Sequence, residues 1–124
     1  MKQVLTTDRA PAAIGPYSQA IISGNVVYVS GQLPIDPKTG QMPEKVTDQA
    51  RQSLQNVKAI LEAAGSSLDK ALRVGIFMTD LSGFAAVNEI YATFFTQNHP
   101  ARSTVQVAAL PRGAQIEIEA VAGL

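Results

Sequence analysis

The sequence predicts an α+β domain in which two helices pack on one face of a β-sheet. Three observations predict this fold: β-type runs occur near both ends of the chain, two helix-type apolar stripes lie between them, and a further β-type run separates the stripes. The resulting order is β-β-α-β-α-β-β. The chain has 124 residues, 46% of them hydrophobic, so residues 1–124 are expected to form a single domain.

The first two strands are predicted to form a hairpin. Gln19–Ser23 is β-compatible, Gly24-Asn25 supplies a turn, and Val26–Ser30 is a β-branched and aromatic run that Gly31 ends. The stretch that follows, Leu33–Pro43, contains three prolines and a glycine, which predicts a loop.

The first helix is expected to begin at Thr47 or Asp48, either of which can cap it. It is expected to end near Gly65, because glycine accepts the backbone geometry that closes a helix. Its apolar stripe has spacings of four and three residues: Ala50, Leu54, Val57, Leu61 and Ala64.

The second helix is expected to begin at Asp80 or Ser82. It is expected to stop at His99-Pro100, because the residue before a proline resists helical geometry. The stripe that should face the core comprises Phe84, Val87, Tyr91, Phe94 and Phe95.

Three further strands complete the predicted sheet: Arg73–Thr79, Ser103–Ala108 and Gln115–Val121. In the last of them, alternation places Ile116, Ile118 and Ala120 on one face and Gln115, Glu117 and Glu119 on the other. The two helices account for only one face of the sheet. We therefore expect another subunit to cover the second face, in a homo-oligomer.

Composition argues against several partners and sites. Ten Lys and Arg balance ten Asp and Glu, and a net charge of 0 favours neither nucleic acid nor an anionic membrane. With no cysteine and with His99 as its one histidine, the chain has no thiolate nucleophile and no Cys- or His-based metal cluster. Without a signal-like N-terminus or an apolar run of about 20 residues, a cytoplasmic protein is expected.

Arg102 is the first candidate binding residue. Alternation places it on the same strand face as Thr104. One interpretation is a structural ion pair with Glu117 or Glu119 on a paired strand. The other is a clamp for a substrate carboxylate, because a guanidinium presents two parallel donors to a carboxylate. Spacing alone does not choose between them.

Glu117 and Glu119 share one strand face, which usually means exposure to solvent. A glutamate turned into a partly closed cleft could instead orient or deprotonate a water, and a raised pKa would help it. Spacing does not decide which of the two glutamates would do so.

Four more residues have two interpretations each. Asn88 lies at the edge of an apolar stripe, where its amide could bond a strand backbone or line a pocket. Ser30 and Gly31 could simply end a strand or allow the close approach of a ligand. Tyr17 could belong to the core or offer its hydroxyl to a site.

Four segments carry a joint pattern: Ala10–Gln19 (APAAIGPYSQ), Val29–Leu33 (VSGQL), Gln49–Gly65 (QARQSLQNVKAILEAAG) and Pro100–Ala120 (PARSTVQVAALPRGAQIEIEA). Together they closely resemble the RidA (YjgF) family of enamine/imine deaminases, from about Thr7 onward. The run Pro-Ala-Arg-Ser followed by Ile-Glu-Ile-Glu-Ala is the most specific part of the resemblance.

The resemblance implies a chorismate-mutase-like fold that assembles as a homotrimer. The three sheets would surround a central barrel, the helices would lie outside, and the active sites would lie between subunits. It also implies hydrolysis of 2-aminoacrylate- and 2-aminocrotonate-type compounds, through their 2-imino tautomers, to 2-keto acids and ammonia. No metal or cofactor is implied.

The resemblance assigns roles to individual residues. Arg102 matches the arginine that binds the substrate carboxylate, and Glu117, rather than Glu119, matches the glutamate that positions the hydrolytic water. The residues matched to the lining of the same pocket are Tyr17, Ser30, Gly31 and Asn88. The sequence departs from many members at Thr104, where they have cysteine, so a hydroxyl that can still bond a substrate replaces an oxidisable thiol. The loop before Pro100 is also shorter than in some members.

Three other functions remain as alternatives. The same cleft could bind small carboxylates without turnover, as a regulatory module. Some relatives are described as translation inhibitors or ribonucleases, although the neutral charge and the lack of a basic, aromatic stripe disfavour a role on RNA. A holdase-like chaperone has no specific support in the sequence.

Overall fold

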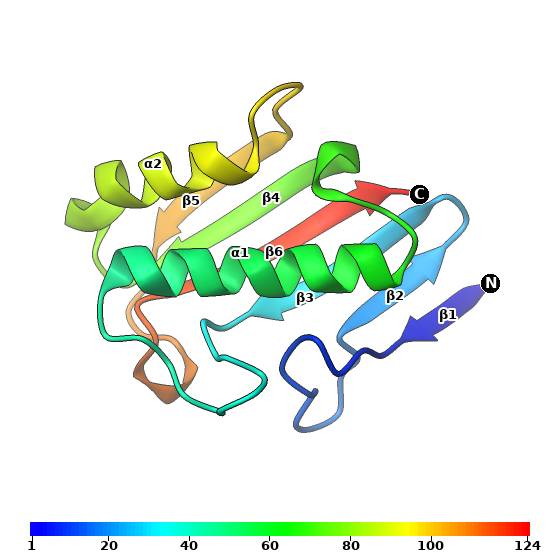
Figure 1. The fold of residues 1–124 in the computed structure, drawn as a ribbon, viewed down its shortest axis with the longest axis horizontal. Coiled ribbons are helices and arrows are strands. Elements are labelled where there is room, and N and C mark those ends of the chain that lie inside the picture. The colour runs from blue at the N-terminus through cyan, green and yellow to red at the C-terminus, as the bar shows by residue number, and fades with distance from the viewer.

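The strands of the computed structural model form one mixed sheet in the order β1-β2-β3-β6-β4-β5 (Figure 1). The model describes all 124 residues. The strands are β1 (Lys2–Leu5), β2 (Ala20–Ser23), β3 (Val26–Gln32), β4 (Ala71–Met78), β5 (Ala101–Gln106) and β6 (Ile116–Gly123). The helices are α1 (Val46–Ala63) and α2 (Phe84–Phe94), and three short 3-10 turns are Leu68–Lys70, Leu81–Gly83 and Pro111–Gly113.

Neighbouring strands are antiparallel except β4 and β5, which run parallel and are joined through α2. A parallel pair needs a long crossover, and a helix is the usual one. The last strand, β6, inserts between β3 and β4, so residues of the chain's end stand at the centre of the sheet. The α+β class and all seven predicted elements are confirmed.

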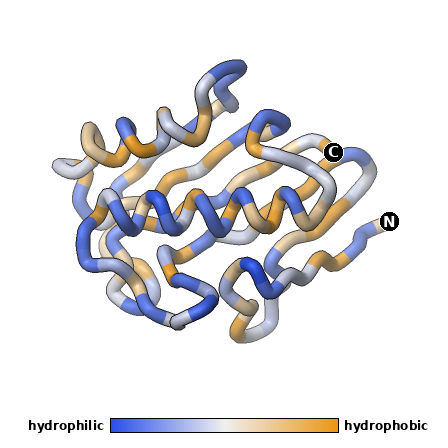
Figure 2. The backbone as a smooth tube through the Cα atoms, viewed as in Figure 1, coloured by the Kyte–Doolittle hydropathy of each residue, from blue (hydrophilic) through white to orange (hydrophobic).

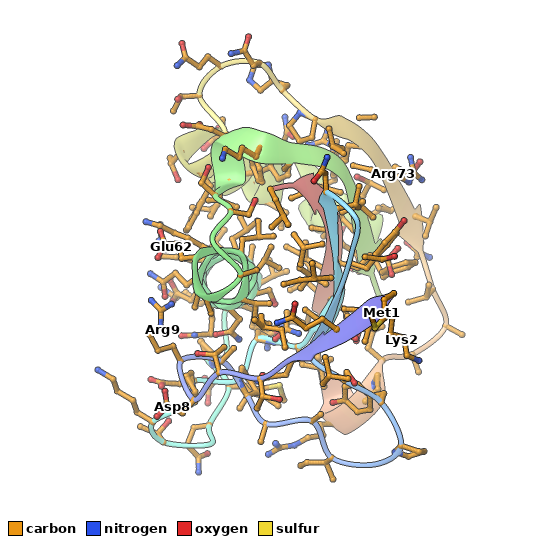
Figure 3. The ribbon with its side chains drawn as sticks, turned by 90° about the vertical axis from the view of Figure 1, so that its right-hand side faces the viewer. Met1, Lys2, Asp8, Arg9, Glu62 and Arg73 are labelled. Atoms are coloured by element: carbon orange, nitrogen blue, oxygen red, sulfur yellow. The ribbon has the colours of Figure 1, made fainter.

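The helices lie on one side of the sheet, and the core fills the space between them (Figure 3). Hydrophobic and hydrophilic residues alternate along α1 in step with its turns (Figure 2), as an amphipathic helix requires. The core side chains from the sheet include Val27, Val74, Ile76, Ile116 and Ile118, each at most 1% exposed.

The end of α1 is a Schellman motif. Gly65 has a φ of +82°. The amide of Ser66 donates to the carbonyl of Leu61, and the amide of Gly65 donates to the carbonyl of Glu62. The predicted role of Gly65 is therefore confirmed. The start is different from the prediction, because α1 begins at Val46 and its N-cap, Lys45, makes no side-chain bond.

Three other boundaries differ from the predictions. The strand β1 was not expected, because its four residues are mostly exposed and show no clear alternation; pairing with β2 at the sheet edge defines it. The second helix ends at Phe94, before His99-Pro100, and Asn98 in the intervening loop has a φ of +51°. The start of this helix also differs from the prediction: Asp80 caps the 3-10 turn Leu81–Gly83, where its carboxylate accepts from the Ser82 amide at 2.9 Å, and α2 itself begins at Phe84.

The face of the sheet opposite the helices has no cover within the chain. Arg73 projects from that side in Figure 3. Strand pairing places Val4, Tyr28 and Val105 there, and these three side chains are 58%, 51% and 45% exposed. Exposed apolar residues on one face are typical of a protein-protein interface. Neither helix has the length and hydropathy needed to cross a bilayer.

Candidate functional site

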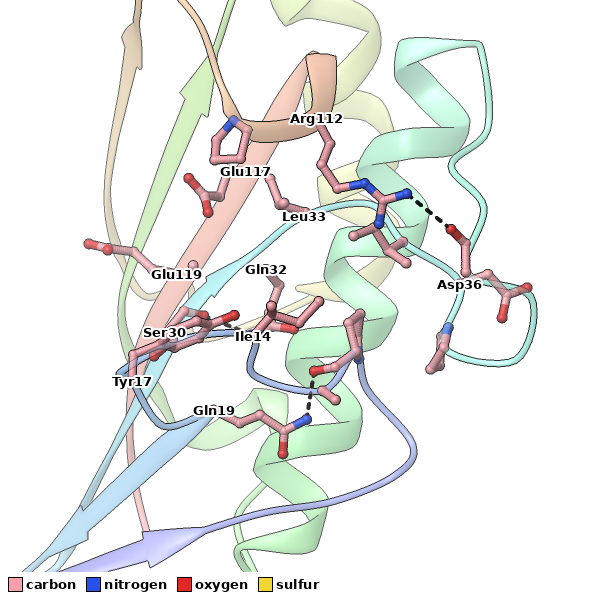
Figure 4. Close-up of a pocket in the computed structure, with 17 residues that line it drawn as sticks. Ile14, Tyr17, Gln19, Ser30, Gln32, Leu33, Asp36, Arg112, Glu117 and Glu119 are labelled. Carbon is pink, nitrogen blue, oxygen red and sulfur yellow. Dashed lines mark hydrogen bonds between the residues drawn. The ribbon is translucent and has the colours of Figure 1, made fainter.

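A cavity of about 850 Å³ opens where β3 and β6 meet the N-terminal loop (Figure 4). Three loops enclose it: residues 11–17, residues 33–40, and the turn at Pro111–Gly113. Five of the predicted and weighed candidates line it: Tyr17, Ser30, Gly31, Glu117 and Glu119. The hollow therefore combines carboxyl groups with a tyrosine hydroxyl and exposed backbone.

Glu117 is the more enclosed of the two carboxyl groups. Its side chain is half-buried beside Gly31, whereas Glu119 is exposed. Burial raises the pKa of Glu117, and the negative charge of Glu119 raises it further. A carboxyl group with a raised pKa exchanges protons closer to neutral pH, which suits acid-base chemistry.

Ser30 and Gly31 lie inside β3 and not at its end, which corrects the predicted boundary. The pairing of β3 with β6 shifts register between Val29 and Gln32, as in a β-bulge, and the bulge directs these two residues to the cavity. The Ser30 hydroxyl donates to the carbonyl of Ser18 at 2.6 Å, which ties the bulge to the loop before β2.

Tyr17 is not a core residue. Its side chain is 53% exposed at the mouth of the cavity, and the Tyr17 amide donates to the carbonyl of Gly15 at 2.9 Å in a tight turn. Gly15 has a φ of +114°, which only glycine adopts readily. The turn therefore presents the tyrosine hydroxyl to the cavity mouth.

Arg102 lies in a second, smaller hollow of about 400 Å³ between α2 and β5. Its Nη1 donates to Oδ1 of Asn88 at 2.8 Å, and its Cζ lies 4.6 Å from the centroid of the Tyr91 ring. The other residues that line the hollow are Ala92, Phe95, His99 and Pro100. Its lining thus combines one cation with aromatic, apolar and polar side chains.

Of the two interpretations of Arg102, the structural ion pair with a glutamate is excluded. Strand β5 pairs with β4 and not with β6, and Arg102 faces α2 whereas Glu117 and Glu119 face the uncovered side. The only carboxylates within ion-pair distance of an arginine belong to Glu62 and Asp48. Arg102 therefore keeps its charge without a carboxylate partner.

Asn88 is exposed, lines the hollow and accepts a bond from Arg102, so of its two interpretations the bond to a strand backbone is excluded. Thr104 follows Arg102 on the same face of β5 and is half-buried. The Thr104 hydroxyl has no hydrogen-bond partner within the chain. A buried hydroxyl without a partner is uncommon and points to an external partner or water.

The candidate residues thus form two groups on opposite faces of the sheet. The lining of the Glu117 cavity and the lining of the Arg102 hollow share no residue. One chain brings together Tyr17, Ser30, Gly31 and Glu117, and separately Asn88 and Arg102, but it does not join the two groups. No three His, Asp or Glu side chains lie together as they would around a metal ion.

Three buried amides hold the cavity walls, and the sequence analysis missed them. The Nε2 of Gln19 donates to the carbonyls of Thr7, Ala10 and Pro11. The Nδ2 of Asn56 donates to the carbonyls of Leu33 and Ile35, and Gln49 bonds Pro43 and Gln115. The signal was present for Gln49 and Asn56, since each precedes a member of the apolar stripe of α1 by one residue.

The Endoribonuclease L-PSP family model matches residues 7–124. The 2-iminobutanoate/2-iminopropanoate deaminase of Escherichia coli is 51% identical over 125 residues, which cover 98% of each chain. Among solved structures, Escherichia coli TdcF with bound serine has a TM-score of 0.96 and 49% identity, and covers 98% of each chain.

The YjgF gene product of Escherichia coli is similar to the same degree, with a TM-score of 0.95, 51% identity and 98% coverage of each chain. The α+β fold, with one mixed sheet and two helices, is that of these structures. Because a family model spans almost all of the chain and relatives share half of its residues, the chain belongs to the YjgF/RidA family, described as Endoribonuclease L-PSP.

Proposed function

We propose that this protein hydrolyses 2-imino acids, and the enamines that tautomerise to them, to 2-oxo acids and ammonia. The observation that carries the proposal is that the chain holds both an arginine without a carboxylate partner, Arg102, and a cavity-facing carboxyl group of raised pKa, Glu117. The identity with the Escherichia coli deaminase supports the same substrate class, 2-iminobutanoate and 2-iminopropanoate.

Arg102 binds the substrate carboxylate. Asn88 occupies one Nη1 donor, which leaves other N–H groups of the guanidinium for two parallel bonds to the carboxylate oxygens. The ring centroids of Phe84 and Tyr91 lie 5.4 Å and 4.6 Å from the guanidinium carbon, and the rings help to hold the group in place. Thr104, on the same strand face, is the further candidate for a bond to this ligand; its hydroxyl has no partner in the chain, but it is enclosed and does not line the hollow.

Glu117 activates water. Its carboxylate accepts a proton from water as the water oxygen bonds to the imine carbon, and the electron pair of the C=N bond moves to nitrogen. The carboxyl group returns this proton to the nitrogen, which gives a neutral carbinolamine. Glu117 then carries the proton of the carbinolamine hydroxyl to the amino group, the C–N bond breaks, and ammonia leaves as the C=O bond forms. One imine and one water become one 2-oxo acid and one ammonia. Positioning and proton transfer are the catalytic contributions needed.

The two groups of residues meet in an assembly. We infer a homotrimer in which Arg102 and Asn88 of one protomer face Tyr17, Ser30, Gly31 and Glu117 of its neighbour. The uncovered sheet face, with Val4, Tyr28 and Val105 exposed, supplies the apolar contact between protomers. Each site is then completed by a second copy, which explains why one chain places its two functional groups on opposite faces.

Two other functions are weaker candidates. The structure of TdcF holds serine, a small carboxylate that is not an imine, so binding without turnover is the alternative for the site. An endoribonuclease, which the family description names, would have to admit a polyanion. Asp36, Glu117 and Glu119 line the large cavity beside a single arginine, Arg112, and this excess of carboxylates disfavours phosphates.

A coupled assay tests the proposal. A serine dehydratase generates 2-aminoacrylate in the presence and absence of this protein, and imine decay and pyruvate formation are followed. We expect the imine to decay faster with the wild-type chain than without protein. The Arg102→Ala variant should keep its fold but should not accelerate the decay. Binding of pyruvate with no acceleration by the wild-type chain would instead support the binding module.

A further inference from the structure

One face of α2 holds the guanidinium of Arg102. Phe84, Asn88 and Tyr91 are four and three residues apart, so they share a side of the helix. The Arg102 Cζ lies 5.4 Å from the Phe84 ring centroid and 4.6 Å from that of Tyr91. Both distances are within the range of cation-π attraction. Two rings and one amide therefore surround a single cation.

These contacts are all with neutral groups. An arginine that is held by a carboxylate would lose much of its attraction for a substrate carboxylate, because the two anions would compete for the same donors. Asn88 uses one donor, and the two rings attract the cation without a carboxylate that would neutralise it. The arrangement fixes the group and leaves its charge and its remaining donors free.

Tyr91 is the best supported of the three contacts. Its side chain is only 6% exposed and stacks on Phe95, with ring centroids 4.5 Å apart. The Tyr91 hydroxyl makes no hydrogen bond of good geometry in the chain. Burial raises the pKa of Tyr91, and the nearby Arg102 guanidinium offsets part of that rise. The best-defined contact of Tyr91 with Arg102 is therefore the face of its ring, which the stack on Phe95 holds in place.

We propose that Tyr91 is a positioning residue, which holds the guanidinium of Arg102 through its ring face in the orientation that receives the substrate carboxylate. The inference rests on the proposed deaminase function. A residue that acts on the carboxylate anchor should affect the binding of the substrate more than the chemical step, so its loss should appear chiefly in KM.

The test compares Tyr91→Leu, Tyr91→Phe and wild type in the coupled imine assay. Tyr91→Leu should raise KM about tenfold, which is the size of effect that the loss of a partly buried cation-π contact usually has. Its kcat should change less than about twofold. Tyr91→Phe keeps the ring and should restore KM to within about twofold of wild type. The Tyr91→Phe variant should also keep the melting temperature, because the hydroxyl it removes makes no hydrogen bond of good geometry.

Phe94→Leu is the matched control. Phe94 is a partly buried aromatic residue of the same helix that does not contact Arg102, so its truncation should lower the melting temperature without raising KM. If Tyr91→Leu does not fold, Phe84→Leu removes the more distant ring and should raise KM by a smaller factor, about threefold.

Three results would overturn the inference. The first is an unchanged KM in Tyr91→Leu, or in Phe84→Leu if Tyr91→Leu does not fold. The second is a Tyr91→Phe variant whose KM rises as much as that of Tyr91→Leu, and the third is an equal rise in KM for Phe94→Leu. Failure of the proposed function is separately visible. In that case the wild-type chain does not accelerate imine decay, or Arg102→Ala turns substrate over normally.

Discussion

The carboxyl group of Glu117 occupies the space where a side chain on Gly31 would begin. A Cβ atom built on Gly31 would lie 2.7 Å from Oε2 of Glu117 and 2.8 Å from its Cδ. Real Cβ atoms do not approach so closely, so the absence of a side chain at position 31 is what allows the carboxyl group to lie against the β3 bulge. The position of Glu117 thus depends on a glycine in a neighbouring strand.

Gly31→Ala should therefore damage turnover far more than stability. The new methyl group would push the end of a flexible side chain, which is cheap for the fold, but it would move the proposed base away from its water. A displacement of this kind costs about a hundredfold in kcat. Steady-state kinetics and thermal unfolding of the purified variant measure the two effects.

Gly75→Ala is the control for this change. A Cβ on Gly75 would lie 3.0 Å from Cγ and Oε2 of Glu119, so the variant disturbs the neighbouring carboxylate in the same manner. We expect kcat to stay within about threefold of wild type, because Glu119 has no assigned proton transfer. Equal losses in both variants would contradict the choice of Glu117.

Substitution of the two glutamates separates their roles directly. Glu117→Gln removes the base and should lower kcat by about a hundredfold to ten-thousandfold, while binding of a 2-oxo acid changes little. Glu119→Gln should retain most turnover. It also removes a negative charge that raises the pKa of Glu117, so the acidic limb of the kcat profile should move to lower pH. A larger loss in Glu119→Gln would reverse the assignment.

Stability should depend on pH through Glu117. Because its pKa is raised in the folded protein, mainly by burial, the folded state binds this proton more tightly than the unfolded chain does. The resulting contribution to stability is fully present below the unfolded pKa and is lost as pH rises through the folded pKa. Denaturant unfolding across this range, at fixed protomer concentration, should show a smaller decline in Glu117→Gln than in wild type. An identical decline would remove Glu117 as its source.

Gln19 should be important for the cavity wall although it does not face a substrate. Gln19→Leu removes the donor to three carbonyls and the acceptor of the Thr7 amide, and should lower the free energy of unfolding by about 1–3 kcal/mol. Hydrogen exchange at the Thr7 amide should accelerate. Gln55→Leu, on the exposed side of α1, is the control and should leave both quantities unchanged. Unaltered exchange in Gln19→Leu would show that other contacts hold residues 7–14.

Much of the fold could be predicted because its periodic signals are strong. The alternation of β6 correctly placed Ile118 in the core and Glu117 on the opposite face, and the stripe of α1 found the buried Leu54. The strand β1 lacked such a signal, since pairing at the edge and not burial defines it. The end of α2 was missed because the loop from Phe95 to Pro100 is set by tertiary packing instead of by the proline.

The resemblance assigns roles to Arg102 and Glu117, and these roles stay predictions. Nothing in the sequence reveals that β6 inserts between β3 and β4, which separates β6 from β5. For that reason spacing alone could not exclude an ion pair between Arg102 and a glutamate of β6. The buried amides Gln19 and Asn56 were missed because a polar residue near an apolar stripe does not by itself reveal which distant carbonyls it will bond.

The most direct test of a site shared between protomers mixes two inactive variants. Arg102→Ala and Glu117→Gln are co-refolded in equal amounts, and deaminase activity is compared with that of each variant alone. If Arg102 of one protomer works with Glu117 of the next in a trimer, random assembly leaves about a quarter of the sites with both residues, and about a quarter of the wild-type activity should return. A mixture no more active than its separate components would contradict the shared site.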